Sequence, residues 1–268
     1  MPTYGFLGVG AIASAIVTGL CEGVEEPPNV VLSPRNAERA AGLAASLPSV
    51  RVATSNQAVV DASDVVVVCV LPADAAEVLA GLDFRADQAV VSAVAGLPVA
   101  RLVDLVSPVG SVARSIPLPA VATRSSRTPV HPATPAVTGL FDGLGGSLVV
   151  DGETAFEAVS AASATVAAHF RYLGTIAEWL AERGVPGPEA QRYLADTFAA
   201  LSDELGAPDP DFSVLAGAHS TPGGLNEQFA RDLGDAGVYD AVRAGLDAVL
   251  QRIAPLPPPR THKSSGLR

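Results

Sequence analysis

Charged and aromatic residues are both scarce in this chain of 268 residues. Only 17% of the residues are charged and 5% are aromatic, whereas 49% are hydrophobic. Lysine and arginine together number 17 against 28 acidic residues, which gives a formal net charge of −11. A surface of this sign repels nucleic acid and anionic lipid. We therefore expect neither nucleic acid nor a membrane as a partner. The length is enough for one large domain or two medium ones, each with its own core.

Cysteine and long apolar runs are also scarce. The two cysteines, Cys21 and Cys69, fall in a helical and a strand pattern, and we interpret both as buried, reduced thiols. The longest apolar run, "VVVVCVLP", is too short to cross a bilayer. The first residues show no signal-peptide pattern, so we expect a cytoplasmic protein. No pair of His, Cys or carboxylate residues has metal-ligand spacing, and we expect no metal.

From residue 3 to about 150, short valine-rich runs alternate with helical patterns. The runs are continuous rather than alternating, which is typical of strands buried on both faces of a sheet. Their alternation with helices predicts βαβ units and a mostly parallel sheet. The seven expected strands are "YGFLG", "VVLS", "VRVA", "DVVVVCVL", "AVVSAV", "SVARSIPL" and "GSLVVD". We expect an α/β domain over residues 1–150.

The second half of the chain changes to helical patterns alone. Residues 151–254 are expected to form an all-helical domain, and its first helical stretch runs from Gly152 to Gly184 with a possible break at Gly174. The last residues, 255–268, are proline-rich and then polar, and we expect a disordered tail there.

The stretch "YGFLGVGAIASAIVTGL", residues 4–20, places a strand, a tight turn and a helix in succession. At the turn, Gly8, Gly10 and Ala13 match the pattern G-x-G-x-x-A. The first glycine permits the turn, the second lets the backbone approach a pyrophosphate, and the small third residue lets helix and strand pack closely. The helix start adds free N–H groups and a positive dipole end. We expect a dinucleotide here; the alternative is a tight turn without a ligand.

The end of the second expected strand indicates which dinucleotide binds. An acidic residue usually stands there to hold the ribose of NAD, but "VVLSPRNAERA" has none at the strand tip. Ser33, Arg35 and Asn36 stand where a 2′-phosphate would lie, and Arg35 can bind phosphate through two N–H groups. We therefore expect NADP. Alternatively, Ser33 and Asn36 cap the next helix and Arg35 is solvated.

Several segments together resemble the pyrroline-5-carboxylate reductase family over about residues 3–252. They include "GFLGVGAIASAIVTGL", "ASDVVVVCVLPADAAEVL", "SVARSIPLPAV" and "HSTPGGLNEQFARDLGDAGVYDAVRAGLDAV". The resemblance implies reduction of a cyclic imine with a nicotinamide cofactor. It also implies a Rossmann-type domain followed by a helical domain that pairs two subunits, and hence a homodimer or larger homo-oligomer. The small apolar face of "FEAVSAASATVAAHF" also favours such an interface.

The resemblance also implies roles for individual residues. The glycine turn would hold the pyrophosphate, the end of the second strand would hold the adenosine phosphate, and two later loops would lie beside the nicotinamide. The cofactor residues implied are Gly8, Gly10, Ala11, Ile12, Ser33, Arg35, Asn36, Leu71, Pro72, Ala95 and Gly96. Ser220 and Thr221 in "STPGG" would bind the substrate carboxylate, since glycines there permit a nest of N–H groups. Alternatively, Thr221 is a helix N-cap with Pro222 at the first helical position.

The chain departs from the family pattern near the substrate. Leu71 replaces a lysine, Leu118 replaces an asparagine, and Ser163–His169 lacks the glycines and proline of the family hinge, so it can continue as a regular helix. Leu225 and Asn226 replace a pair of threonines. The cofactor site is thus kept while the substrate site is remodelled. These changes predict a bulkier or less polar imine than pyrroline-5-carboxylate.

Histidines are the remaining candidates for proton transfer. His169 lies on the helix with the altered hinge, and its imidazolium could protonate an imine nitrogen; alternatively it is solvated or part of the core. His219 precedes Ser220 and could face the same carboxylate. His131 and His262 are expected in a loop and in the tail.

Three functions fit these residues. The first is an NADPH-dependent reductase of a C=N bond, acting on a cyclic imine. The second is a reductase of another acceptor, such as a ketone or a deazaflavin. The third is an NADP-binding scaffold or sensor without catalysis. The fold alone does not choose among them, because chemistry depends on the site.

Overall fold

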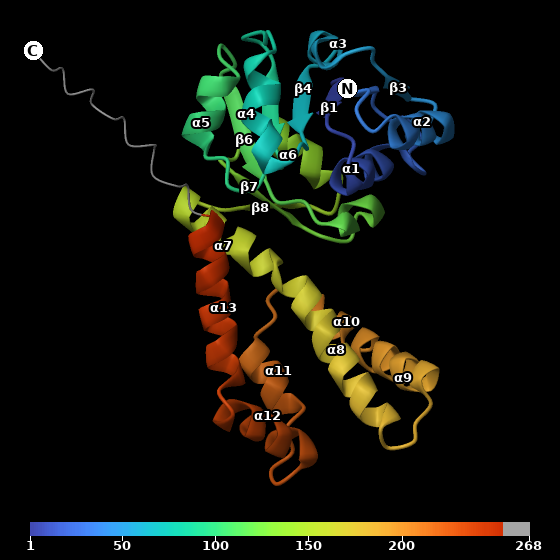
Figure 1. The fold of residues 1–268 in the computed structure, drawn as a ribbon, viewed down its shortest axis with the longest axis vertical. Coiled ribbons are helices and arrows are strands. Elements are labelled where there is room, and N and C mark those ends of the chain that lie inside the picture. The colour runs from blue at the N-terminus through green and yellow to red at the C-terminus, as the bar shows by residue number, and fades with distance from the viewer. Residues whose placement is uncertain (254–268) are drawn as a thin grey trace, which may run out of the picture. The chain divides into compact units, whose positions relative to one another are not determined.

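A computed structural model describes residues 1–253 (Figure 1). The chain divides into two compact units: Met1–Ser160, together with residues 252 and 253, and Ala161–Gln251. The predicted tail, residues 255–268, lies outside the described residues. No helix within residues 1–253 is long and apolar enough to cross a membrane.

The first unit is built on an eight-stranded sheet in the order β3-β2-β1-β4-β5-β6-β7-β8. All neighbouring strands are parallel except β6 and β7, which are antiparallel. The strands are β1 (Tyr4–Leu7), β2 (Val30–Leu32), β3 (Val50–Val52), β4 (Val65–Val68), β5 (Ala89–Ser92), β6 (Ser111–Ser115), β7 (Thr128–His131) and β8 (Ser147–Val149).

Helices cover both faces of this sheet, because successive residues of each valine-rich strand point to opposite faces. Phe6, Val67 and Val91 face a core that also contains side chains of α1, α2, α6 and η1. Leu7 and Val66 face a second core with side chains of α3, α4 and α5. The helices of this unit are α1 (Ala11–Cys21), α2 (Ala37–Ser46), α3 (Asn56–Asp61), α4 (Pro72–Ala80), α5 (Val99–Leu105) and α6 (Pro135–Asp142), and η1 (Pro119–Thr123) is a 3₁₀ helix.

These observations confirm the predicted α/β sheet domain followed by helices. One strand and two helices were not predicted. "TPVH" forms β7, so His131, expected in a loop, is the last residue of a strand. Three of its four residues are buried, but Val130 is the only large aliphatic one among them, so the segment gives no recognisable apolar run. The short helices α3 and α6 have Ser55 and Thr134 as their N-caps, and the hydroxyls of these caps accept hydrogen bonds from the N–H groups of Ala58 and Val137.

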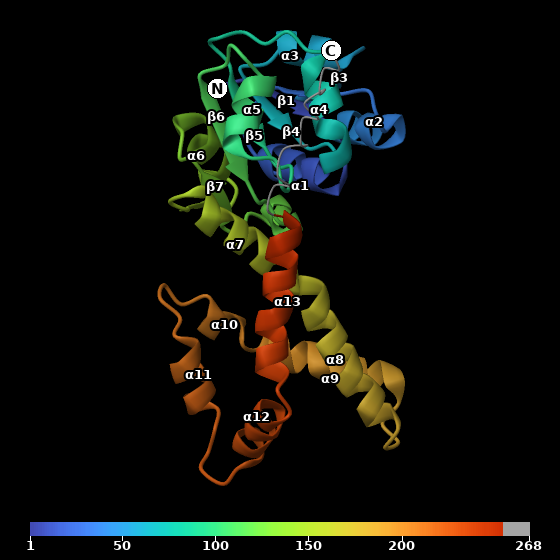
Figure 2. The ribbon, with the colours of Figure 1, turned by 60° about the vertical axis from the view of Figure 1, so that its left-hand side comes forward.

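Helices alone make up the second unit. The helices from residue 153 onward are α7 (Glu153–Ser163), α8 (Thr165–Ala181), α9 (Gly187–Ala199), α10 (Ser202–Leu205), α11 (Phe212–Ala218), α12 (Leu225–Asp235) and α13 (Val238–Ile253). The division between the units falls within α7, after Ser160; the predicted domain boundary near residue 150 stays a prediction. Figure 2 shows α8 and α9 side by side, and their contact buries Ala177, Ala190 and Leu194.

The expected continuous helix across residues 163–169 is interrupted. α7 ends at Ser163 and α8 begins at Thr165, with Ala164 between them at φ −71° and ψ −10°. The Ala164 N–H bonds the carbonyl of Ala161, three residues back, and the Thr165 hydroxyl donates to the Ala162 carbonyl at 2.7 Å. The helix is therefore interrupted by a tight turn, closed by a hydrogen bond between residues three apart. A side-chain hydroxyl also binds a carbonyl that would otherwise accept a backbone hydrogen bond of the helix. Gly174, which the sequence offered as a possible break, lies inside α8.

A buried ion pair fixes the start of α7 to the sheet. Arg114 of β6 is 1% exposed, and its guanidinium lies 2.6 Å from the carboxylate of Glu157 and 2.8 Å from that of Glu153. The guanidinium also lies 4.7 Å from the centre of the Phe156 ring. The N–H of Val99, at the start of α5, also donates a hydrogen bond to the Glu153 carboxylate, at 2.8 Å. These contacts join α7, β6 and α5 within the first unit.

Candidate cofactor and substrate site

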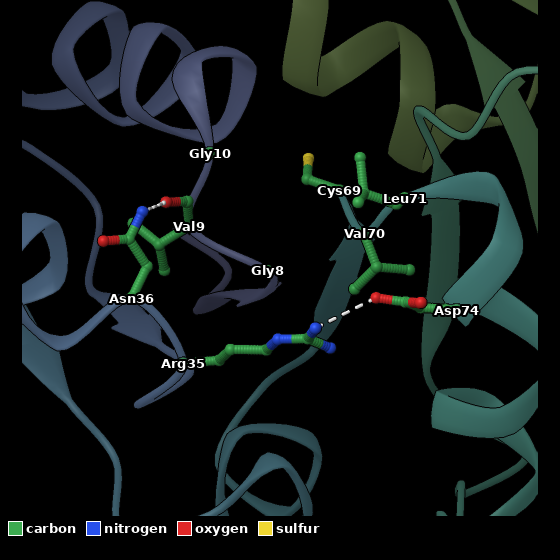
Figure 3. A pocket seen from close by; sticks show the side chains of 9 residues that line it. All are labelled: Gly8, Val9, Gly10, Arg35, Asn36, Cys69, Val70, Leu71 and Asp74. Carbon is green, nitrogen blue, oxygen red and sulfur yellow. Dashed lines mark hydrogen bonds and ion pairs between the residues drawn. The ribbon is translucent and has the colours of Figure 1, made fainter.

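A pocket of about 210 Å³ opens where the carboxyl ends of β1, β2 and β4 meet. In this sheet β1 lies between β2 and β4, so the chain order reverses there, and such a reversal is the usual ligand site of an open α/β sheet. The lining residues are Gly8, Val9, Gly10, Arg35, Asn36, Cys69, Val70, Leu71 and Asp74 (Figure 3).

Gly8 and Gly10 form the turn between β1 and α1. Gly8 has φ +88°, and a Cβ there would lie 2.8 Å from the carbonyl oxygen of Cys69. The position therefore requires glycine for both its backbone and its close approach to β4. A Cβ on Gly10 would meet no described atom within 4 Å. The free space at Gly10 faces the pocket, where a ligand's phosphates can approach the backbone.

The N-terminus of α1 faces the same space. Gly10 is its N-cap, and within residues 1–253 no side chain caps this end. The first N–H groups of a helix have no partner inside the helix. Together with the helix dipole, they form an anion site. The turn and α1 therefore fit a pyrophosphate.

Two polar contacts hold the β2–α2 loop against the glycine turn. The Ser33 hydroxyl accepts the Gly8 N–H at 2.9 Å, and the Asn36 side chain donates to the Val9 carbonyl at 3.0 Å. Asn36 has φ +64°, a conformation that asparagine tolerates better than most residues. Asn36 is the N-cap residue of α2 by position, but its side chain makes no cap bond to the helix, and Ser33 lies three residues earlier. Both residues instead position the loop.

Arg35 is the cation of this pocket, and it is not freely solvated. Its guanidinium lies 3.1 Å from the carboxylate of Asp74, and Figure 3 shows the two side chains meeting across the pocket. Asp74 comes from the first turn of α4. A guanidinium can hold a phosphate through two parallel N–H bonds, so the pocket fits a phosphorylated ribose as well as a pyrophosphate.

Comparison with known proteins then gives the family. A family model described as "NADP oxidoreductase coenzyme F420-dependent" matches residues 3–96. A pyrroline-5-carboxylate reductase of Mycobacterium tuberculosis is 30% identical over 289 aligned positions, which cover 94% of this chain and 96% of that protein. The chain belongs to the pyrroline-5-carboxylate reductase family. Membership confirms the resemblance drawn from the sequence and the expected class of enzyme, a reductase.

Solved structures of family members share the fold. A 1-pyrroline-5-carboxylate reductase from Streptococcus pyogenes matches with a TM-score of 0.79 at 24% identity, over 94% of this chain and 98% of that one. A pyrroline carboxylate reductase from Plasmodium falciparum, solved with NADP bound, matches with a TM-score of 0.78 at 15% identity, over 94% of this chain and 96% of that one. At these identities the likeness concerns the fold.

Not every expected cofactor residue of this pyrroline-5-carboxylate reductase family member lines the pocket. Gly8, Gly10, Arg35, Asn36 and Leu71 do. Ser33 is fully buried beneath the turn, where it holds the Gly8 N–H. The remaining expected residues lie outside the lining: Ala11 and Ile12 in α1, Pro72 at the start of α4, and Ala95 and Gly96 after β5.

Sequence reasoning did not predict Asp74 or Cys69 in the pocket. Both follow β4, the strand next to β1, and residues after neighbouring parallel strands meet at one edge of the sheet. The same rule predicts both positions, but an acidic residue was expected only at the end of β2. Cys21 and Cys69 are both free thiols, and Cys69 is half-buried rather than buried. Burial raises the pKa of Cys69 to about 12, so the thiol stays protonated at neutral pH.

The "STPGG" segment connects α11 to α12 in the second unit. Gly224 is the N-cap of α12, which begins at Leu225, so the alternative with Thr221 as N-cap and Pro222 at the first helical position is wrong. The Gly223 N–H donates to the carboxylate of Glu227 at 2.7 Å. The Ser220 hydroxyl donates to the Ala216 carbonyl at 2.7 Å. An N–H of this loop therefore already binds a carboxylate, that of the chain's own Glu227.

The two histidines considered for proton transfer lie in the second unit. His169 is exposed on α8, and its ring meets Phe198 edge-on, with centroids 6.1 Å apart. His219 lies 2.9 Å from the Glu204 carboxylate through Nε2, and its carbonyl accepts a bond from Asn226. His219 thus adjoins the "STPGG" segment. Within residues 1–253 no cluster of His, Cys, Asp or Glu side chains could hold a metal ion.

Proposed function

We propose that this chain is an NADP-dependent reductase that delivers a hydride to the C=N bond of a cyclic imine. The observation that carries the proposal is the pocket at the β1–α1 turn, with Arg35 at its edge, in a chain of the pyrroline-5-carboxylate reductase family. When bound, the nicotinamide supplies the hydride, and the protein supplies binding and orientation.

The residues at the pocket fit NADP. The backbone at Gly8, Gly10, Ala11 and Ile12 binds the pyrophosphate, since this turn leaves open space over Gly10 and a helix end without a side-chain cap. Arg35 binds the 2′-phosphate. Ser33 and Asn36 contribute to phosphate binding indirectly, because their hydrogen bonds position the β2–α2 loop that carries Arg35.

The nicotinamide end of the cofactor is assigned by the family resemblance. Leu71 and Pro72, after β4, and Ala95 and Gly96, after β5, border the nicotinamide. Both loops follow neighbouring parallel strands, so they lie at the same edge of the sheet as the glycine turn.

The substrate's acidic group binds at "STPGG". Ser220 and Thr221 supply hydroxyls, and the Gly223 N–H already donates a hydrogen bond to a carboxylate, that of Glu227, which supports this chemistry. Glu227 competes for that N–H, and Leu71 and Leu118 present apolar walls where the family has lysine and asparagine. The preferred imine is therefore bulkier or less polar than pyrroline-5-carboxylate.

His169 is the first candidate for the proton donor to the imine nitrogen, and His219 is the second.

The protein works as a homodimer or larger homo-oligomer through its helical unit. Large apolar side chains are exposed there, among them Phe170, Trp179, Tyr193, Phe229 and Tyr239.

The family's organisation, a Rossmann-type domain followed by a helical domain, places the domain boundaries near residues 150 and 254. The two free thiols suit a reducing compartment, which supports a cytoplasmic location. Family membership favours neither a non-catalytic scaffold nor reduction of a ketone or deazaflavin.

Arg35→Ala tests the cofactor assignment. Loss of a charged hydrogen-bond pair should weaken NADPH binding by about 1.5–3 kcal/mol. Isothermal titration calorimetry measures the affinity, and Arg39→Ala is the control, since Arg39 is an exposed cation on α2, the helix that follows Arg35, and lies outside the pocket lining. Equal NADPH affinity in wild type and Arg35→Ala would remove Arg35 from the phosphate site.

A further inference from the structure

The ion pair between Arg35 and Asp74 occupies the place where a 2′-phosphate would bind. The charged atoms are 3.1 Å apart, and both residues line the pocket (Figure 3). The Asp74 side chain is 33% exposed and the Arg35 side chain is 67% exposed, so the pair is only partly screened by solvent.

Asp74 is positioned at the pocket edge by the first turn of α4. Pro72 begins α4, and Asp74 lies in its first turn, where the helix dipole stabilises a carboxylate. The Asp74 N–H donates to the Leu71 carbonyl at 3.0 Å. The backbone of Asp74 is therefore fixed at the start of α4, beside the pocket, and of the two charged side chains that of Arg35 is the more exposed.

The phosphate and the carboxylate compete for one guanidinium. A ribose 2′-phosphate carries a charge of about −1.5 to −2 near neutral pH and accepts the same parallel N–H bonds as a carboxylate. To bind the phosphate, Arg35 gives up or shares its bond to Asp74, and the phosphate approaches a like charge. NAD has no 2′-phosphate, so it leaves the ion pair intact.

We propose that Asp74 limits the preference of this protein for NADP over NAD by competing with the 2′-phosphate of NADP for Arg35. The proposal rests on NADP as the cofactor of the proposed function. The ion pair opposes NADP binding and leaves NAD binding unaffected, so it narrows the discrimination between the two cofactors. Arg35 favours NADP, and Asp74 limits how strongly.

Asp74→Asn tests this role by removing the charge while keeping the size of the side chain. The dissociation constants of NADP⁺ and NAD⁺ are measured by calorimetry. The Kd of NADP⁺ should fall about two- to fivefold, the range expected for a partly exposed ion pair, and the Kd of NAD⁺ should stay within about twofold. Asp74→Ser gives the same result if the charge is responsible.

Two further variants separate competition from a general charge effect. Glu77→Gln removes the same charge from an exposed position of α4 outside the pocket lining, and it should leave both constants unchanged. In an Arg35→Ala background, Asp74→Asn should no longer tighten NADP⁺ binding, because nothing is left to compete for.

Three results would overturn the proposal: unchanged NADP⁺ affinity in both Asp74 variants, equal tightening of NAD⁺, or an Asp74 effect that persists without Arg35. If wild type binds neither NADP⁺ nor NAD⁺, the proposed function itself fails. If wild type binds NADP⁺ but its affinity does not depend on Asp74, only the role of Asp74 is contradicted.

Discussion

Gly8 and Gly10 are two positions apart in one turn, yet the structure constrains them differently. Gly8 has a positive φ, and a Cβ there would meet the backbone of Cys69, the residue after β4. Gly10 has φ −92° and ψ −166°, an extended conformation open to any residue, and the space around it is free. The first glycine is therefore required by the fold, and the second by the ligand.

This difference predicts opposite outcomes for two alanine substitutions. Gly8→Ala should lower the free energy of unfolding by about 1–3 kcal/mol or more, because of strain and the close contact with Cys69. Gly10→Ala should change it by no more than about 0.5 kcal/mol, yet weaken NADP⁺ binding. Urea unfolding and calorimetry measure the two quantities. The account is wrong if Gly10→Ala binds NADP⁺ like wild type.

Elements could be predicted from the sequence where their pattern was strong. Continuous valine runs identified the parallel strands, and the small-residue helix after the glycine turn identified α1. β7 was missed because Val130 is its only large aliphatic residue, although three of its four residues are buried. The break at Ala164 was missed because alanine and threonine carry no strong stop signal; the break depends on local hydrogen bonds.

The site could be predicted only in part for a related reason. Arg35 and the glycines are in motifs of fixed spacing, whereas Asp74 reaches the pocket through the pairing of β1 with β4. A pattern along the chain does not reveal which helix faces which strand end. The role of Ser33 was also hidden, since its burial beneath Gly8 depends on packing.

The Arg114–Glu157 pair should be important for joining α7 to the sheet. Arg114→Met leaves Glu157, whose side chain is 7% exposed, without its cation, and should destabilise the protein by about 3–5 kcal/mol. Arg114→Met with Glu157→Met removes both charges and should recover most of that loss. Chemical denaturation measures both variants. Equal destabilisation by the single and double variants would contradict an electrostatic role for the pair.

For the whole molecule, the exposed apolar side chains of the helical unit predict self-association. Phe170 is 67% exposed on α8, and burial in a subunit interface would remove this surface from water. Light scattering should find a dimer or larger oligomer at micromolar concentration. Phe170→Glu should shift it toward the monomer, whereas Val103→Glu, at an exposed position of α5, should not. A monomeric wild-type protein would contradict the prediction.

The central claim is reduction of a cyclic imine with NADPH, and steady-state NADPH oxidation tests it most directly. Pyrroline-5-carboxylate should be assayed beside six-membered and substituted cyclic imines at saturating NADPH. The account predicts turnover, with a bulkier or less polar imine preferred, because Leu71 and Leu118 replace polar family residues. Pyrroline-5-carboxylate as the best substrate by a wide margin would contradict the predicted preference. No turnover with any imine, in a protein that binds NADPH, would contradict the proposed reaction.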